Sequence, residues 1–200
     1  LHQWQKDLPS IKSLQKVIPP ASSEKRFIWI PLQGSWMLPE NYINGMKLVG
    51  EALVTVNLIT EEFYKKTIER REKEIIEYSN IVKKKIEEIN PQNINVISSN
   101  FQTEFLKWLG FNVVAEYPRA EEITIKIWGE LLKVGKEKNV KLVVENLQSG
   151  EIQTVRALAN EINAKSIVLS NFPLTYSEDK RWEDSVLHNV NTIIKALEHN

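Results

Sequence analysis

The stretch TEEFYKKTIERREKEIIEYSNIVKKKIEEI, residues 60–89, decides how this chain is organised. It contains no Gly and no Pro, and Asn90 and Pro91 follow it directly. Thr60 is a favourable N-cap, the two glutamates after it lie where the helix dipole favours anions, and Pro91 disfavours helical geometry at Asn90. The stretch therefore predicts one long helix, and about 29 residues at roughly 1.5 Å each give a length of about 43 Å.

The apolar residues of this helix form one narrow stripe, and opposite charges four residues apart support much of the remaining surface. A coiled coil is one interpretation, but Arg71 and Lys85 fall at seam positions that should be apolar. We therefore expect a rigid strut that joins two lobes, with a partial N-terminal lobe over residues 1–59, a linking helix over 60–90 and an α/β lobe over 91–200. The stripe consists of Ile68, Ile75, Val82 and Ile89, flanked by Tyr64, Ile76, Tyr78 and Ile86.

The composition argues against several classes of protein. The chain has 200 residues, of which 42% are hydrophobic, which is enough to build a packed core. Its 26 basic and 26 acidic residues cancel, so nothing marks it as a binder of nucleic acid or of an anionic membrane. There is no Cys for disulfides or thiolate chemistry. No apolar run approaches the roughly 18 residues of a membrane span, and the start of the chain is not a signal peptide, so we expect any anchor or targeting signal to lie outside this chain.

The first lobe offers one evident strand. Residues 26–32, with Phe27-Ile28-Trp29-Ile30 in the middle, predict a short buried strand, and the spacing of apolar residues over 1–11 predicts one or two short helices. Pro39 suits the first turn of a helix that places Tyr42, Met46, Val49, Leu53 and Val56 on one face. We expect the sheet of this lobe to be incomplete.

Beyond Pro91, strands and helices alternate. Four strands interleaved with four helices predict a parallel sheet with helices on both faces, so the fold class is α/β. The expected strands are residues 94–97, 111–115, 140–144 and 166–169, and the expected helices are 101–109, 121–136, 150–163 and 181–197.

Polar residues stand where three of these strands end. Ser98-Ser99-Asn100, Glu145-Asn146 and Ser170-Asn171 each follow an expected strand. Ligands of open α/β sheets bind outside the carboxyl ends of strands, so these side chains could line one cleft for a small polar solute. Ser and Asn also cap helices and form turns routinely. Glu145 is costly to bury without a partner, so it either coordinates a cation or pairs with a lysine or arginine.

The order of several motifs resembles the zinc- and manganese-binding solute receptors of ABC importers, in which one long helix joins two α/β lobes. The likeness covers nearly the whole chain and implies that fold, an importer as partner, and a location outside the cytoplasm, at the cell surface or in the periplasm. The motifs are Leu1-His2-Gln3-Trp4, Trp36-Met37-Leu38-Pro39-Glu40-Asn41, Gly50-Glu51-Ala52-Leu53, Ile97-Ser98-Ser99-Asn100-Phe101, Val143-Val144-Glu145, Leu158-Ala159-Asn160-Glu161 and Val168-Leu169-Ser170-Asn171.

The chain departs from this family at its metal ligands. Gly34 or Ser35 stands where the resemblance implies a histidine, Asn100 where it implies histidine or glutamate, and Ser170 or Asn171 where it implies aspartate. Neutral Ser and Asn oxygens are poor zinc ligands, so we expect no resident cofactor and no ordinary zinc or manganese site. The family's opening strands, with its first histidine ligand, have no counterpart before Leu1, so we expect the first lobe to be truncated or completed by another segment, including a second copy in a dimer.

We therefore predict a solute-binding receptor of an ABC importer whose ligand contacts are Ser35, Asn100, Glu145, Ser170 and Asn171. The alternative is a scaffold or adhesion protein that keeps the fold and has lost its ligand. An enzyme is disfavoured because the sequence contains no GxGxxG, GxSxG, GxxxxGK[ST] or HExxH motif. The three histidines, His2, His188 and His199, give no evident shared metal site.

Overall fold

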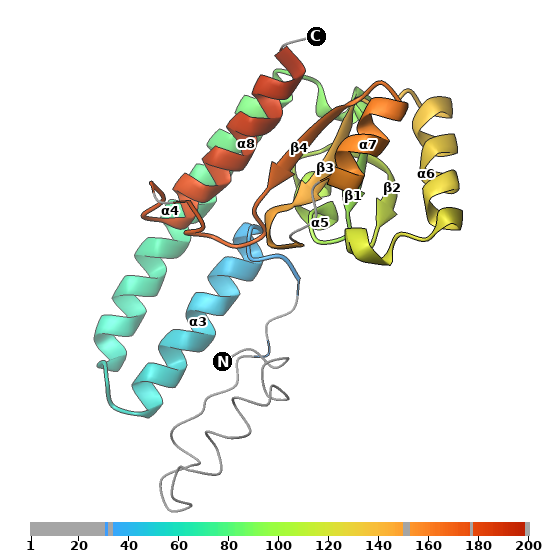
Figure 1. The fold of residues 1–200 in the computed structure, drawn as a ribbon. Coiled ribbons are helices and arrows are strands. Elements are labelled where there is room, and N and C mark those ends of the chain that lie inside the picture. Colours follow the sequence, from blue (N-terminus) through green and yellow to red (C-terminus); the bar gives the residue numbers. More distant parts are fainter. Residues whose placement is uncertain (1–30, 32–33, 150–152, 177, 199–200) are drawn as a thin grey trace, which may run out of the picture. The chain divides into compact units, whose positions relative to one another are not determined.

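The computed structural model describes residues 31, 34–149, 153–176 and 178–198 (Figure 1). The helices predicted over residues 1–11 lie outside these ranges, and so does the strand predicted over 26–32 except for Pro31. The chain divides into two compact units. The first comprises Leu1–Gly34 and Pro39–Ile76, and the second comprises Ser35–Leu38 and Glu77–Asn200.

The predicted long helix is confirmed as one continuous element, α4, over Glu61–Glu87. The Thr60 hydroxyl accepts a hydrogen bond from the Phe63 amide at 3.2 Å, which is the expected cap. At the other end, Asn90 adopts a left-handed conformation with φ 51°, and Pro91 opens a 3-10 turn, Pro91–Asn93. The division into residues 1–59, 60–90 and 91–200 stays a prediction.

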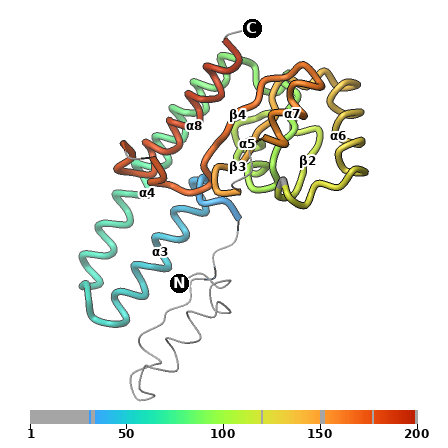
Figure 2. Tube along the Cα trace, in the orientation of Figure 1, coloured from blue at the N-terminus to red at the C-terminus, as the bar shows by residue number. Residues whose placement is uncertain are grey.

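In the first unit, helix α3, Pro39–Thr55, lies alongside the first half of α4, as both ribbon and tube show (Figures 1 and 2). An ion pair joins Lys47 to Glu72 at 2.8 Å, and the Tyr64 hydroxyl donates to the Lys47 carbonyl oxygen at 3.4 Å. Gly50 is buried beside the Tyr64 ring, and a Cβ built at this glycine would collide with that ring. The close approach of the two helices here therefore depends on a residue without a side chain.

The second unit contains a four-stranded sheet in the order β2-β1-β3-β4, with every neighbouring pair parallel. Helices cover both of its faces, as the sequence predicts (Figure 1). The strands are β1 Asn95–Ser99, β2 Asn112–Tyr117, β3 Leu142–Asn146 and β4 Lys165–Leu169, and the helices are α5 Thr103–Trp108, α6 Ile125–Glu137, α7 Gln153–Glu161 and α8 Trp182–Glu198.

The main differences from the sequence prediction concern where elements begin and end. Strands β1 and β3 each run two residues further than expected. Helix α6 begins at Ile125 rather than 121 because the Thr124 hydroxyl accepts from the Ile127 amide, while Ala120–Glu122 form a separate 3-10 turn. No helix in the described part of the chain combines the length and the apolar character needed to cross a bilayer.

One hydrophobic core of this unit lies on one face of the sheet, under α6 and α7. Alternate strand residues Ile97, Tyr117 and Val143 pack there against Val155 and Leu158 of α7. Ile97 pairs with Val143 in the register of β1 and β3, so their side chains point to the same face. This packing fixes the position of the carboxyl ends of the strands, where the candidate site lies.

Candidate functional site

The carboxyl edge of the sheet carries four of the five predicted contact residues. Asn100 follows β1 directly and is exposed, and Ser170 and Asn171 follow β4. Glu145 does not follow its strand: it lies inside β3 and is 1% exposed. Ser98, Ser99 and Asn146 likewise lie within strands, because pairing continues to Tyr117 in β2 and to Leu169 in β4.

Ser35, the fifth predicted contact residue, belongs to the same unit through the short segment Ser35–Leu38. Its amide donates to the Glu104 carboxylate of α5 at 2.8 Å, and its hydroxyl accepts from the Met37 amide at 3.2 Å. The Trp182 indole of α8 donates to the Trp36 carbonyl oxygen at 3.0 Å. The segment is therefore anchored to α5 and α8, and Glu104, which the sequence interpretation did not single out, connects Ser35 to the helix that follows Asn100.

The Glu145 carboxylate is engaged within the fold. Its Oε1 accepts from the Asn146 amide at 2.6 Å, and its Oε2 lies 3.3 Å from the Tyr117 hydroxyl, which also donates to the Val144 carbonyl oxygen at 2.8 Å. Burial, and then the charge of Glu145, raise the pKa of Tyr117, so the phenol stays protonated and available as a donor. A ligand that used Glu145 would have to compete with these hydrogen bonds.

Ser170 is also occupied by the protein's own groups. Its backbone amide and carbonyl form a reciprocal pair with the Asn189 side chain of α8, at 3.1 and 2.8 Å. Its hydroxyl lies 2.9 Å from the Gln148 amide nitrogen and 2.7 Å from the Thr175 hydroxyl. Gln148 in turn accepts from the Asn171 amide at 3.2 Å. This network holds the loop after β4 against β3 and α8.

Gln102 is a central residue of the edge that the sequence interpretation missed. Its side chain is fully buried, and its amide nitrogen donates to both Asn146 Oδ1 and the Leu169 carbonyl oxygen, each at 2.9 Å. One side chain at the start of α5 thus connects the ends of β3 and β4. A glutamine after a strand carries no local signal for this role, because both of its partners are distant in sequence.

The donor set of this edge is mostly neutral. Within the described residues, no group of three or more His, Cys, Asp or Glu side chains is arranged to hold a metal ion. Its titratable groups include Glu145 and Tyr117, which are hydrogen-bonded to one another, and Glu104, whose carboxylate accepts from the Ser35 amide. The hydroxyl and amide groups of this edge can donate and accept hydrogen bonds, whereas zinc favours imidazole, thiolate and carboxylate ligands.

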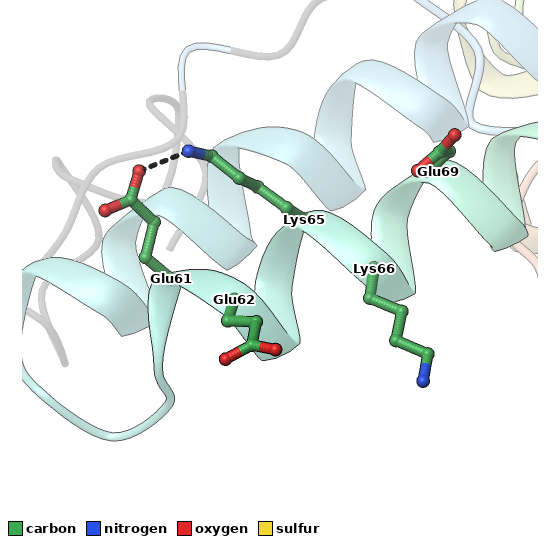
Figure 3. A pocket seen from close by; sticks show the side chains of 5 residues that line it. All are labelled: Glu61, Glu62, Lys65, Lys66 and Glu69. Atoms are coloured by element: carbon green, nitrogen blue, oxygen red, sulfur yellow. Dashed lines mark ion pairs between the residues drawn. The ribbon is translucent and has the colours of Figure 1, made fainter.

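A separate shallow pocket lies on the first turns of α4, lined by Glu61, Glu62, Lys65, Lys66 and Glu69 (Figure 3). All five side chains are exposed, and the Glu61–Lys65 ion pair of 2.7 Å is a helical i,i+4 pair. Its hydrogen bond and charge lower the pKa of Glu61. A solvated pair on one helix face is an ordinary stabilising feature, so we do not place a ligand here.

Several solved structures of bacterial proteins share the fold of this chain. The manganese-bound periplasmic metal binding protein of Candidatus Liberibacter asiaticus aligns with a TM-score of 0.66 and 16% identity over 84% of this chain and 64% of that chain. The laminin-binding protein Lbp of Streptococcus pyogenes aligns with a TM-score of 0.71 and 14% identity, over 92% and 78%. The SBP FpvC of P. aeruginosa, in complex with Ni2+, aligns with a TM-score of 0.63 and 13% identity, over 85% and 66%.

These likenesses define the fold as that of periplasmic metal-binding proteins. Residues 34–196 also match the family described as zinc-uptake complex component A, periplasmic, and the chain belongs to this family. It spans about two thirds of the length of the Liberibacter protein. No curated protein sequence matches it.

Proposed function

We propose that this chain acts outside the cytoplasm as the solute-binding receptor of an ABC importer. The observation that carries the proposal is the family match over residues 34–196, which includes the whole polar carboxyl edge. Asn100 and Asn171, together with Ser35, would contact the solute, and Ser170 would contact it only in exchange for one of its bonds within the fold. Glu145 would stabilise the edge through its hydrogen bonds with the Tyr117 hydroxyl and the Asn146 amide.

The chemistry of the edge argues for weak binding of zinc. Hydroxyl and amide oxygens are hard, neutral donors, which suit magnesium, calcium and manganese better than zinc, and a tight site for any of them would need more charge than these residues supply. We therefore expect the solute to be polar and bound mainly by hydrogen bonds.

The test is a titration of the purified chain, after dialysis against a chelator, with ZnCl2 and MnCl2, while thermal unfolding is followed by tryptophan fluorescence. A ligand at about 1,000 times its Kd stabilises a protein by about 4 kcal/mol, so a nanomolar site gives a clear rise in Tm at micromolar metal. We expect no such rise. A saturating rise with one metal equivalent would show that the ordinary metal function persists despite the substituted ligands.

The importer partnership needs a test in cells. Deletion of the gene should reduce uptake of one solute from a labelled panel, and restoration with the wild-type gene should recover it, whereas unchanged uptake of every solute would argue against a receptor.

Adhesion on the same fold is the second candidate. It is favoured by the TM-score of 0.71 with the laminin-binding protein Lbp, the highest of the values given above. Saturable binding to immobilised laminin, together with unchanged uptake in the deletion strain, would favour adhesion over transport. A dimer that completes the first lobe remains a prediction, which sedimentation equilibrium would decide.

A further inference from the structure

Two turns at the carboxyl edge share an unusual pairing of residues. Phe101-Gln102 follows β1, and Asn171-Phe172 follows β4. The Gln102 amide nitrogen lies 2.9 Å from the Leu169 carbonyl oxygen, and Asn171 is two residues further along the same strand end. The two turns are therefore neighbours, although 69 residues separate Gln102 from Asn171 in the sequence.

Each turn contains a buried side-chain oxygen that accepts no hydrogen bond from any described residue. These atoms are Gln102 Oε1 and Asn171 Oδ1. The Gln102 amide cannot be turned over to repair this, because its nitrogen faces two acceptors, the Leu169 carbonyl and Asn146 Oδ1. A buried acceptor without a donor costs about 1 to 3 kcal/mol, so these two oxygens, beside the Ser99 hydroxyl that is likewise unpaired among the described residues, offer places for a donor from outside the protein.

Each of these residues has an exposed phenylalanine as its direct neighbour in the chain. Phe101 is 37% exposed and Phe172 is 40% exposed. The face of Phe101 already attracts a cation, since the Arg119 guanidinium carbon lies 5.9 Å from the ring centroid. The edge thus combines two buried acceptors with two partly exposed aromatic rings, of which Phe101 already faces the Arg119 guanidinium and Phe172 offers its surface to apolar groups and cations. Neither oxygen is itself exposed, so a ligand reaches them only when side chains of these turns rotate.

We propose that this part of the edge binds a small organic solute that carries a primary ammonium group on an apolar body. The inference rests on the proposed receptor function and names its substrate class. An ammonium group donates up to three N–H bonds, which Gln102 Oε1 and Asn171 Oδ1 accept, while the apolar body packs on Phe101 and Phe172. A calcium ion would need about six to eight oxygen ligands, and zinc would need imidazole, thiolate or carboxylate, so the two amide oxygens fit the ammonium group better.

The experiment is calorimetric titration of the full chain with three probes: benzylammonium chloride, tetramethylammonium chloride, which has no N–H donor, and benzyl alcohol, which has no charge. We expect saturable binding of benzylammonium and at least about tenfold weaker binding of the other two, because a hydrogen bond to a charged group is worth about 1.5 to 3 kcal/mol. Equal affinity for tetramethylammonium, or no saturable binding of benzylammonium, would overturn the proposal.

Variants test the residues. Asn171→Leu should weaken benzylammonium binding about tenfold or more, and Phe172→Ala should also weaken it. The matched controls, Asn160→Leu on the exposed surface of α7 and Phe63→Ala at an exposed position of α4, should leave it unchanged. Should Asn171→Leu fail to fold, Asn171→Asp keeps the acceptor and adds charge, so it should bind benzylammonium more tightly than the wild type. Unchanged affinity in the folded Asn171 variants would refute the assignment.

The two proposals fail separately. Uptake of a metal ion or of a solute without an amine, combined with no benzylammonium binding, would refute the ammonium site and leave the receptor function intact. Binding of benzylammonium with unchanged uptake of every labelled solute in the deletion strain would support the site and argue against import.

Discussion

Gln102 gives the sharpest test of how the carboxyl edge is held together. Gln102→Leu keeps nearly the same volume but removes the donor that serves Asn146 Oδ1 and the Leu169 carbonyl oxygen, both at 2.9 Å and both buried. Each acceptor left without a donor costs about 1 to 3 kcal/mol, while loss of the unpaired Gln102 Oε1 returns part of that cost. We expect the free energy of unfolding to fall by about 2 to 4 kcal/mol.

The assay is urea unfolding followed by far-ultraviolet circular dichroism, with the m-value held as a check on cooperativity. Gln148→Leu is the matched control, because Gln148 is exposed although it also bonds to the loop after β4. We expect this control to cost less than about 1 kcal/mol, as surface substitutions usually do. If the free energy of unfolding of Gln102→Leu lies within about 0.5 kcal/mol of the wild-type value, the Gln102 amide does not connect the two strand ends in solution. The edge would then not be preorganised in the way described.

Three further predictions concern the framework around this edge. Gly135→Ala should destabilise the chain by about 1 to 3 kcal/mol, because the new Cβ would lie 2.7 Å from the Ile162 side chain. Gly129→Ala in the same helix should stabilise it by about 0.5 to 1 kcal/mol, because its Cβ would meet nothing within 4 Å. Thermal unfolding of the two variants compares these effects. Burial and the charge of Glu145 raise the pKa of Tyr117, so this phenol ionises only on unfolding, and the free energy of unfolding should fall by up to about 1.4 kcal/mol per pH unit above about pH 10. The Tyr117→Phe variant has no phenol to ionise, so its free energy of unfolding, measured with urea between about pH 9 and 11, should fall less steeply with pH than that of the wild type. Thr124→Ala should cost about 1 kcal/mol by removing the cap of α6, with circular dichroism as the measurement, and an unchanged midpoint would show that Ile127 finds another acceptor.

The fold of the second unit could be predicted from sequence because its signals are local. Asn90 and Pro91 mark the end of α4, and alternation of short apolar runs with helical periodicity indicates a parallel sheet. The errors lie where a local signal was ambiguous. Thr124 is a better cap than the residues before 121, and it delays α6 to Ile125. Glu145 and Asn146 look like loop residues after Val-Val, but pairing with β4 keeps them in the strand.

The candidate site could be predicted only in outline. The sequence could place Asn100, Ser170 and Asn171 at strand ends because it predicted the strands that precede them. The hydrogen-bond partners at this edge could not be predicted from local sequence. Asn189 bonds to the backbone of Ser170, 19 residues away, and Gln102 bonds to Leu169, 67 residues away. Such contacts depend on the order of strands in the sheet and on the docking of α5 and α8, which no short-range pattern specifies.

Most polar side chains described at this edge are hydrogen-bonded within the protein. A structural or tightly bound metal contributes folding free energy, so removal of the ion loosens its ligands. Here the side chains of Gln102, Asn146, Gln148 and Asn189 already bond to one another or to the strand ends. The backbone of the edge is thus held in place before any ligand arrives, so binding needs only local rotation of side chains in the two turns to make the hydrogen bonds that the protein leaves unmade. A solute that provides those bonds should raise stability modestly and change the dimensions of the chain little, whereas marked compaction in solution scattering on addition of a ligand would show that the edge is not preformed.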